Sequence, residues 1–180
     1  MPEIEIRPAS PEDLPTLCAL DHSYTSDFVW QMEVQTEEEG KTAISFREIR
    51  LPRSVRVDYP RAAGTLLADW EQWAGILVAR LAGDPVGYAA LMLDLAPATA
   101  WMTDLVVKRR LRRQGIGSAL VLAAQEWGLH QTCRNLILEM QPKNYPAIHL
   151  AQKLGFDFCG YNDRYFLNHD IGLFFAKTLR

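Results

Sequence analysis

Hydrophobic and polar positions alternate in short stretches of the chain, and this pattern predicts β-strands. Residues 4–7 alternate in this way. Residues 28–35 and 44–51 are rich in aromatic and β-branched side chains on either side of an acidic turn at Glu37–Gly40, so they predict a hairpin. A turn at Ala82–Pro85 joins two apolar runs and predicts a second hairpin. The runs of this second hairpin are residues 76–81 and 86–95. The further strand candidates are residues 98–107, 136–140, 156–160 and 171–176.

Helices are predicted where apolar residues recur at the helical period. Residues 116–129 and 145–154 show this period, and Gly155 is placed to end the second of them. A first helix is predicted over residues 10–21, because a serine cap, a proline and acidic residues suit a helix N-terminus. Residues 58–75 have no clear period and are expected to form a short helix or an irregular loop.

The order of these elements predicts an α/β fold with one mixed sheet. An antiparallel N-terminal half precedes a strand–helix–strand–helix–strand half, in which residues 98–140 are expected to form a right-handed crossover between parallel strands. No internal repeat or low-complexity tract divides the chain, and 180 residues suit one domain. We therefore expect a single domain over residues 1–180.

Composition narrows the classes of function. Hydrophobic residues make up 48% of the chain and charged residues 23%, as in an ordinary soluble protein, and no apolar run approaches membrane-spanning length. The formal net charge of -3 argues against broad binding of nucleic acid. The three cysteines lack CxxC spacing and the four histidines lack metal-ligand spacing. We therefore expect reduced thiols, no metal site and a cytoplasmic protein without a secretory signal.

A basic, glycine-containing stretch between a predicted strand and a predicted helix is the main chemical signal. Residues 108–120 are KRRLRRQGIGSAL, and Gly115 and Gly117 stand where the helix would begin. Unpaired N–H groups at a helix N-terminus bind phosphate, glycine lets the phosphate approach, and arginine adds charge-assisted hydrogen bonds. The spacing RxxGxG fits neither the P-loop nor the dinucleotide fingerprint. By itself the stretch leaves open a phosphate cradle, a solvated basic turn or a nucleic-acid patch.

Two motifs together resemble the GNAT superfamily of acyl-CoA-dependent N-acetyltransferases. The first is Arg112–Gly117, which matches Q/R-x-x-G-x-G/A after a strand, and the second is Asn144–Phe156, which is similar to N-x-x-A-x-x-L-Y-x-K-x-G-F. The strand LILEM at residues 136–140 is similar to the LxLEV strand of that family. The opening ALDHSYTSD at residues 19–27 resembles the streptothricin (nourseothricin) acetyltransferase branch. The resemblance implies a GNAT-like fold whose βαβ half binds coenzyme A.

The resemblance also implies acetyl-CoA as the cofactor. In the family, the diphosphate lies on backbone N–H groups of the first motif, and the pantetheine arm pairs like an extra strand beside the strand before the loop. Asn144 matches a position that commonly contacts this arm. The implied cofactor-binding residues are Leu105, Val106, Val107, Arg112, Arg113, Gln114, Gly115, Ile116, Gly117, Ser118 and Asn144.

The implied chemistry is attack of an amine on a thioester. A base is needed because an alkyl amine, with a pKa near ~10, is protonated at pH 7. Asp104 is the first candidate base, on the strand where many family members place a catalytic acid, and Glu139 on the next strand is the second. Asp104 is also open to a role as an anchor for the substrate ammonium or as a solvated strand-end carboxylate. Glu139 is also open to a structural pairing with Arg112 or Lys143.

Ala151 departs from the family pattern at a position where a tyrosine often protonates the leaving thiolate. Either another tyrosine takes this role, with Tyr145, Tyr161 and Tyr165 as candidates, or the thiolate leaves unassisted. Tyr161 completes the predicted catalytic set. Each of these tyrosines is also open to a role in packing alone.

A cationic acceptor needs carboxylates and aromatic walls near the thioester. The predicted first helix and the segment after it supply such side chains, and these residues are also open to a purely structural role. The candidate substrate contacts are Asp21, Tyr24, Asp27 and Trp30.

The residues and the resemblance lead to one function prediction with alternatives. We expect an N-acetyltransferase that moves an acetyl group from acetyl-CoA to a primary amine of a small cationic molecule, with a streptothricin-like antibiotic as first candidate. A protein lysine or N-terminal acetyltransferase and a non-catalytic acyl-CoA sensor stay open. The expected partner is a small-molecule amine, without nucleic acid or membrane, and a homodimer stays open.

Overall fold

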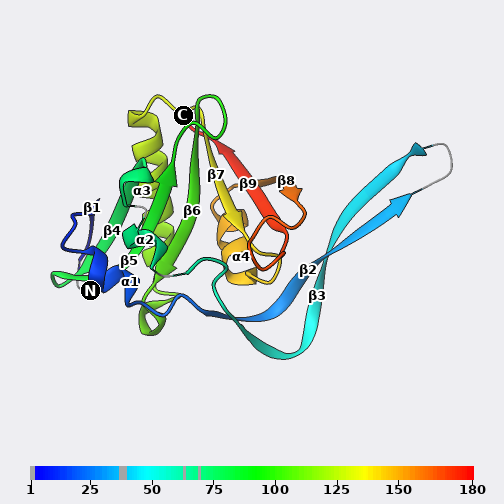
Figure 1. Ribbon diagram of the computed structural model, residues 1–180, viewed down its shortest axis with the longest axis horizontal. Coiled ribbons are helices and arrows are strands. Elements are labelled where there is room, and N and C mark those ends of the chain that lie inside the picture. Colours follow the sequence, from blue (N-terminus) through cyan, green and yellow to red (C-terminus); the bar gives the residue numbers. More distant parts are fainter. Residues whose placement is uncertain (1–2, 37–39, 63, 69) are drawn as a thin grey trace.

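The structure is a computed structural model of the 180-residue chain, and it describes residues 3–36, 40–62, 64–68 and 70–180. A seven-stranded mixed sheet forms the body (Figure 1). Its order is β1-β4-β5-β6-β7-β9-β8, and β6 and β7 are its parallel neighbours. The strands of this sheet are β1 (Ile4–Pro8), β4 (Gly75–Leu81), β5 (Asp84–Met92), β6 (Thr99–Val107), β7 (Asn135–Met140), β8 (Asp157–Asn162) and β9 (Gly172–Thr178). The antiparallel first half and the parallel β6–β7 pair confirm the predicted fold class.

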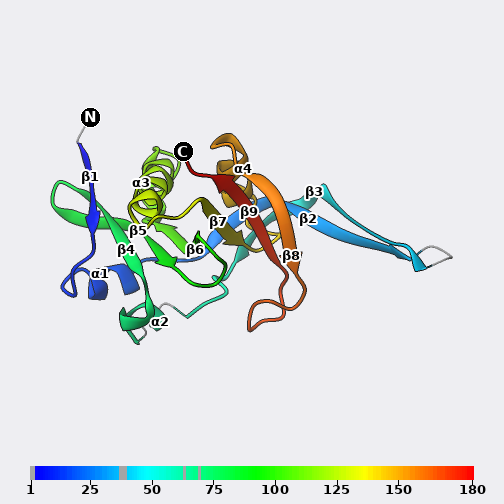
Figure 2. The same ribbon diagram turned by 90° about the horizontal axis from the view of Figure 1, so that it is seen from above.

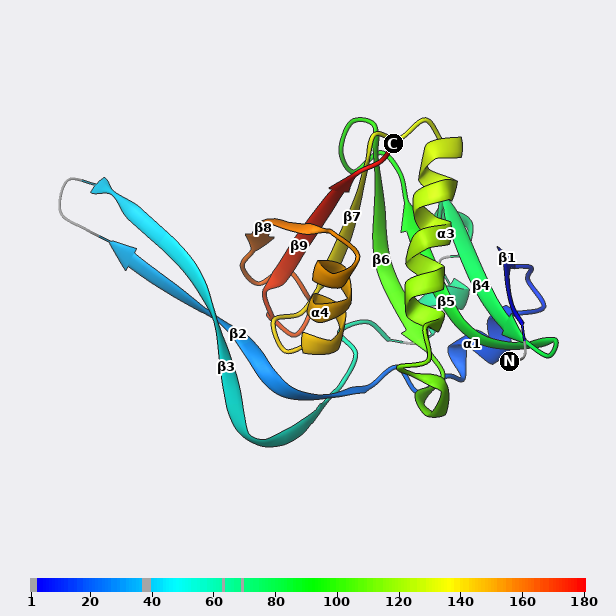
Figure 3. The ribbon, with the colours of Figure 1, turned by 180° about the vertical axis from the view of Figure 1, so that it is seen from behind.

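Helices cover both faces of the sheet (Figures 2 and 3). The two longer helices, α3 and α4, lie on one face, and α3 connects β6 to β7. The short α1 and α2 lie on the other face. The helices are α1 (Leu14–Cys18), α2 (Thr65–Ala68), α3 (Ile116–His130) and α4 (Tyr145–Lys153), with short 3-10 turns η2 (Trp70–Gln72) and η3 (Arg109–Leu111). Among the described residues, no helix combines the length and the apolar character needed to cross a membrane.

Two hydrophobic cores hold the helices on the sheet. The larger core lies beneath α3 and α4, where Leu120, Ile148 and Phe175 have no exposed surface. The smaller core lies beneath α1 and α2, where Leu17 and Val78 have none. Because successive side chains of a strand point to opposite faces, the central strands contribute to both cores.

The remaining strands form a separate antiparallel ribbon that extends away from the body (Figures 1 and 3). These strands are β2 (Tyr24–Thr36) and β3 (Thr42–Val57). The ribbon confirms the first predicted hairpin and is longer than predicted. The predicted turn at Glu37–Gly40 lies outside the described residues, except for Gly40. At its base the ribbon is tied to the body, since the Trp30 N–H donates to the Pro142 carbonyl over 3.0 Å.

The outer part of the ribbon, residues 31–36 and 42–47, is called the arm below. Cross-strand pairing puts Val34 opposite Ile44, on the face that also carries Phe46. Phe46 packs against the larger core. Val34 and Ile44, further out, are 54% and 43% exposed. The arm therefore carries an apolar face that this chain covers only at its base.

The first helix is shorter than predicted. The Ser10 N–H and hydroxyl both donate to Asp13, over 2.8 and 3.1 Å, and so close a turn before α1 begins. After Cys18 the chain leaves the helix, and the carbonyls of Asp21 and Ser23 accept hydrogen bonds from an arginine 91 and 89 positions along the chain. These long-range contacts oppose the local helical pattern.

Candidate active site

β6 and β7 separate part of the way along their length. They pair in parallel only as far as Met102 and Leu138. The register of β6 on β5 shifts between Met102 and Asp104, which leaves Thr103 as an extra residue, a β-bulge. Asp104 on β6 and Glu139 on β7 therefore lie just past the last paired residues of the two strands.

A cavity of about 490 Å³ opens beside this separation. Its walls come from the outer end of β6, the loop and first turn of α3, one face of α4, the start of β2 and Tyr59. The predicted cofactor-binding residues, apart from Gln114 and Ile116, border it. The structure therefore gathers around one hollow the residues that the two motifs had placed apart in the sequence.

The glycine loop forms the N-terminal end of α3. Gly115 is the residue before the helix and has a φ of +89°, in the left-handed region that favours glycine. Ala119 donates to the Gly115 carbonyl over 2.9 Å, so the N–H groups of the three residues between them have no partner within the helix. Arg109, Arg113 and Lys153 also border the cavity. This end of the cavity therefore presents helix amides together with positive charge, which suits a phosphate group.

Arg112 binds backbone in the cavity wall. Its guanidinium donates to the carbonyls of Val107 (2.8 Å), Ser23 (2.6 Å) and Asp21 (2.6 Å). These bonds clamp the end of β6 to the segment that leads into β2. Arg112 therefore shapes the wall of the cavity, and each of its three guanidinium nitrogens already donates one hydrogen bond to backbone.

The two candidate bases lie outside the lining of the cavity, in a buried charge cluster with Arg61. Asp104 is 4% exposed, and the side chain of Glu139 is fully buried. The guanidinium of Arg61 donates to Glu139 and to the Thr103 carbonyl (2.9 Å), and its Nη1 lies 3.7 Å from Asp104 Oδ1. Asp104 is therefore not a solvated strand-end carboxylate. The structural partner of Glu139 is Arg61, where the sequence suggested Arg112 or Lys143.

Both carboxylates also accept hydrogen bonds from neutral side chains. Asp104 accepts from the Tyr59 hydroxyl (2.7 Å) and the Thr103 hydroxyl (2.9 Å), and Glu139 accepts from Tyr165 (2.8 Å) and Trp101. Burial raises the pKa of Glu139, while Arg61 and these donors oppose the rise. Burial and the Asp104 charge raise the pKa of the Tyr59 phenol, which therefore stays protonated.

Arg61 and Tyr59, which contact the buried carboxylates, were not indicated by the sequence. Both lie in the segment between β3 and α2, where no periodic pattern exists. The sequence did indicate that a cation should lie near Asp104 and Glu139, because two carboxylates on buried strands require one. Nothing in the local sequence said which of the chain's arginines it would be.

Of the four predicted substrate contacts, only Tyr24 borders the cavity. The Tyr24 hydroxyl donates to Gln141 over 2.7 Å. Asp21 is held away from the cavity by Ser23 and Arg109, and the Ser23 hydroxyl in particular lowers the pKa of Asp21 to about 2. Asp27 accepts from Ser54 on the exposed ribbon.

Trp30 and Tyr161 lie in an aromatic cluster at the base of the ribbon. Trp30 packs on Phe175 and Tyr161 on Phe46, with ring centroids 5.5 and 5.4 Å apart. Neither residue borders the cavity. The structure therefore places Tyr161, the predicted third catalytic residue, away from Asp104 and Glu139.

The other two tyrosine candidates are also bonded elsewhere. The Tyr145 hydroxyl donates to Glu48 over 3.4 Å, and that of Tyr165 donates to Glu139. Ala151 itself is fully buried in the larger core. The tyrosines in the described lining of the cavity are Tyr24 and Tyr59, and neither was among the candidates for the role of the family tyrosine.

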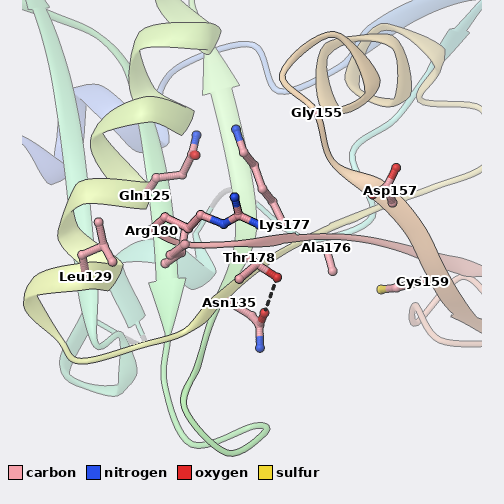
Figure 4. A pocket seen from close by; sticks show the side chains of 11 residues that line it. Gln125, Leu129, Asn135, Gly155, Asp157, Cys159, Ala176, Lys177, Thr178 and Arg180 are labelled. Atoms are coloured by element: carbon pink, nitrogen blue, oxygen red, sulfur yellow. Dashed lines mark hydrogen bonds between the residues drawn. The ribbon is translucent and has the colours of Figure 1, made fainter.

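A second hollow, of about 670 Å³, lies at the opposite end of the sheet, between α3 and the ends of β8 and β9 (Figure 4). Its side chains include Gln125, Asp157 and Lys177, and the hydrogen bond drawn there joins Thr178 to Asn135 over 3.3 Å. None of the predicted site residues borders it. No group of His, Cys, Asp and Glu suited to a metal ion occurs in the part of the chain that the structure describes.

Comparisons with known proteins agree with this geometry. The Acetyltransferase (GNAT) family matches residues 43–156. A streptothricin acetyltransferase from Streptomyces lavendulae is 28% identical over 162 residues, which are 87% of this chain and 82% of the relative. The crystal structure of a nourseothricin acetyltransferase superposes with a TM-score of 0.81 at 23% identity, covering 98% of this chain and 99% of that one. A Bacillus anthracis str. Ames protein provisionally named streptothricin acetyltransferase, solved with acetyl coenzyme A, gives 0.75 at 17% identity over 98% and 99% of the two chains.

Proposed function

Since the chain belongs to the GNAT family of acetyltransferases, we propose that it acetylates a primary amine of a small cationic molecule. A streptothricin-like antibiotic is the first candidate, because the Streptomyces lavendulae relative is named for that substrate. The observation that carries the proposal is one cavity that joins a helix-amide cradle to Tyr59, whose hydroxyl donates to the buried carboxylate of Asp104. Acetyl-CoA, the cofactor of the family, supplies the activated acetyl group.

The residues at the cradle fit the diphosphate of coenzyme A. The unpaired amides of residues 116–118, the left-handed Gly115 and the cations Arg109, Arg113 and Lys153 all favour bound anions. We propose that these groups hold the diphosphate and that the end of β6, residues 105–107, aligns the rest of the cofactor. Asn144, at the start of α4, borders the same cavity.

The charge of the buried cluster favours a cationic acceptor. Asp104 and Glu139 carry two negative charges against the single positive charge of Arg61, so the cluster keeps one excess negative charge. Tyr24 and Tyr59 supply aromatic surface on the cavity wall. We propose that the ammonium group of the acceptor binds against this wall.

A free-thiol release assay with a panel of amines tests the proposed function. The panel holds streptothricin, spermidine, an aminoglycoside and a lysine peptide, each with acetyl-CoA. We expect turnover of streptothricin and no turnover by the Gly115→Val variant, because a β-branched residue is strained at a φ of +89°. Turnover of another amine without streptothricin would reject the antibiotic as substrate. Acetyl-CoA binding without turnover of any amine would favour a sensor.

We further propose that the arm binds a second copy of this chain. The exposed pair Val34 and Ile44 continues, without a charged residue, the apolar face that begins at Phe46. A second copy presents the same uncharged face, so two arms are complementary to each other in a twofold dimer.

Light scattering after size-exclusion chromatography tests the dimer. We expect the wild-type chain to elute as a dimer and Val34→Lys/Ile44→Lys to elute as a monomer. The matched control is Gln35→Lys/Ser45→Lys, which places the same charges on the opposite face of the arm and should stay dimeric. A monomeric wild-type chain would contradict the proposal.

A further inference from the structure

Tyr59 connects the cavity to a carboxylate that the cavity does not reach. Its side chain borders the cavity, and its hydroxyl donates to Asp104 Oδ1 over 2.7 Å. Asp104 is 4% exposed and does not itself border the cavity. An amine in the cavity therefore meets Tyr59 before it meets Asp104.

The other contacts of Asp104 leave Tyr59 as the route to it. The Thr103 hydroxyl occupies Oδ2 over 2.9 Å, and Arg61 lies 3.7 Å from Oδ1. Thr103 and Arg61 do not border the cavity. Among the described neighbours of Asp104, Tyr59 is thus the one that both bonds the carboxylate and faces the cavity.

His22, which borders the cavity and packs against Tyr59, is already engaged at both ring nitrogens. Its Nδ1 lies 2.7 Å from the Leu20 carbonyl, which can only accept, so Nδ1 carries a proton. Its Nε2 lies 2.9 Å from the Tyr88 hydroxyl. A neutral His22 therefore accepts from Tyr88 and has no lone pair left for an amine.

We propose that Tyr59 is a catalytic residue that passes a proton from the acceptor ammonium to Asp104. The ammonium gives one proton to Tyr59 Oη as the phenolic proton of Tyr59 moves to Asp104 Oδ1. The amine becomes neutral and nucleophilic, Tyr59 remains a phenol, and Asp104 becomes a carboxylic acid that later loses its proton to solvent. The inference rests on the proposed function, since it needs an amine in the cavity.

The two transfers have to be concerted. Because burial and Asp104 raise the pKa of Tyr59, a free phenolate is costly, and Tyr59 does not act as a base by itself. A phenol that gains one proton while it releases another avoids that charge. Tyr59 is therefore suited to relay a proton and unsuited to store one.

The Tyr59→Phe variant tests the relay, because it removes the hydroxyl and keeps the ring. We expect kcat for streptothricin to fall by at least ~10²-fold, the lower end of the range for proton transfer by a positioned group. The affinity for acetyl-CoA in calorimetry should not change. The matched control is Tyr88→Phe, which also removes a buried tyrosine hydroxyl, the one bonded to His22, and should keep the wild-type kcat.

A second acceptor separates proton transfer from structural damage. In streptothricin with its reactive amine replaced by an alkoxyamine, the attacking nitrogen is neutral at pH 7 and needs no base before attack. Tyr59→Phe should acetylate this analogue at the wild-type rate, whereas a merely distorted site would be slow with both acceptors. Wild-type kcat in Tyr59→Phe, or equal losses with both acceptors, would overturn the relay. If the wild-type enzyme does not acetylate streptothricin, the same two measurements are made with the panel amine that it does acetylate and with the alkoxyamine analogue of that amine. A wild-type enzyme that acetylates no amine would overturn the proposed function as well.

Discussion

Replacing Asp104 by asparagine is expected to lower kcat for amine acetylation by about 10²–10⁴-fold, the usual contribution of a positioned base. Asparagine has the same shape and still offers an oxygen to the Tyr59 hydroxyl, so the buried hydrogen bond can persist. It cannot accept the proton that the ammonium must lose. Steady-state thiol release with a saturating amine measures the effect.

Calorimetry and the amine KM distinguish the roles that the sequence left open for Asp104. A base affects kcat and leaves acetyl-CoA affinity unchanged, because Asp104 does not border the cavity where the cofactor is proposed to lie. An ammonium anchor would raise the KM for the amine at an unchanged kcat. Wild-type values for both constants would leave Asp104 with a structural role and would remove the end point of the proposed relay.

Replacing Arg61 by methionine is expected to lower the free energy of unfolding by about 3–5 kcal/mol at pH 7, because it leaves two buried carboxylates without their cation. The side chain of Glu139 has no exposed surface and that of Asp104 has 5%. Methionine replaces most of the packing volume of Arg61, so the loss reports mainly on charge. Urea denaturation followed by circular dichroism measures it.

The pH dependence of this loss follows from the sign of the Glu139 shift. Burial raises the pKa of Glu139, and Arg61 opposes the rise, so removing Arg61 raises it further. The unfolded pKa of a glutamate is about 4.3. When the folded-state pKa is higher, the group contributes stability that is fully present below the unfolded pKa and is lost as the pH rises through the folded pKa. The gap between variant and wild type should therefore narrow as the pH falls from 7 toward 4.5.

An exposed ion pair provides the matched control for Arg61. Arg47 pairs with Glu33 over 2.7 Å on the arm, with side chains 64% and 34% exposed. Arg47→Met should cost less than about 1 kcal/mol, because solvent screens such pairs. Equal losses in the two variants would mean that the buried cluster does not depend on Arg61 for its charge balance.

The proposed cofactor half of the site could be predicted from the sequence because its signal is local. Gly115 needs a left-handed backbone, and the helix that follows begins within two residues. Asn144 caps α4, as its side chain accepts from the Ala147 N–H over 3.3 Å. Such features depend on neighbours a few residues apart, so spacing alone predicts them.

The surroundings of Asp104 and Glu139 could not be predicted in the same way. Tyr59 and Arg61 reach their partners across 45 and 78 positions of sequence, from a segment with no periodic pattern. Tyr161 was a reasonable candidate by residue type. The structure nevertheless packs it on Phe46 at the base of the ribbon, since β8 lies at the far edge of the sheet.

The sequence by itself determined the family, the order of strands and helices, and the glycine loop before α3, because each depends on the spacing of nearby residues. The tertiary structure alone decided which side chains surround Asp104. It made Arg61 the counter-charge of both carboxylates and Tyr59 the contact of Asp104 with the cavity. The physical reason is that a buried charge needs a partner close in space, and that partner can lie far away in the sequence. The residues between the two partners do not indicate which side chains will meet.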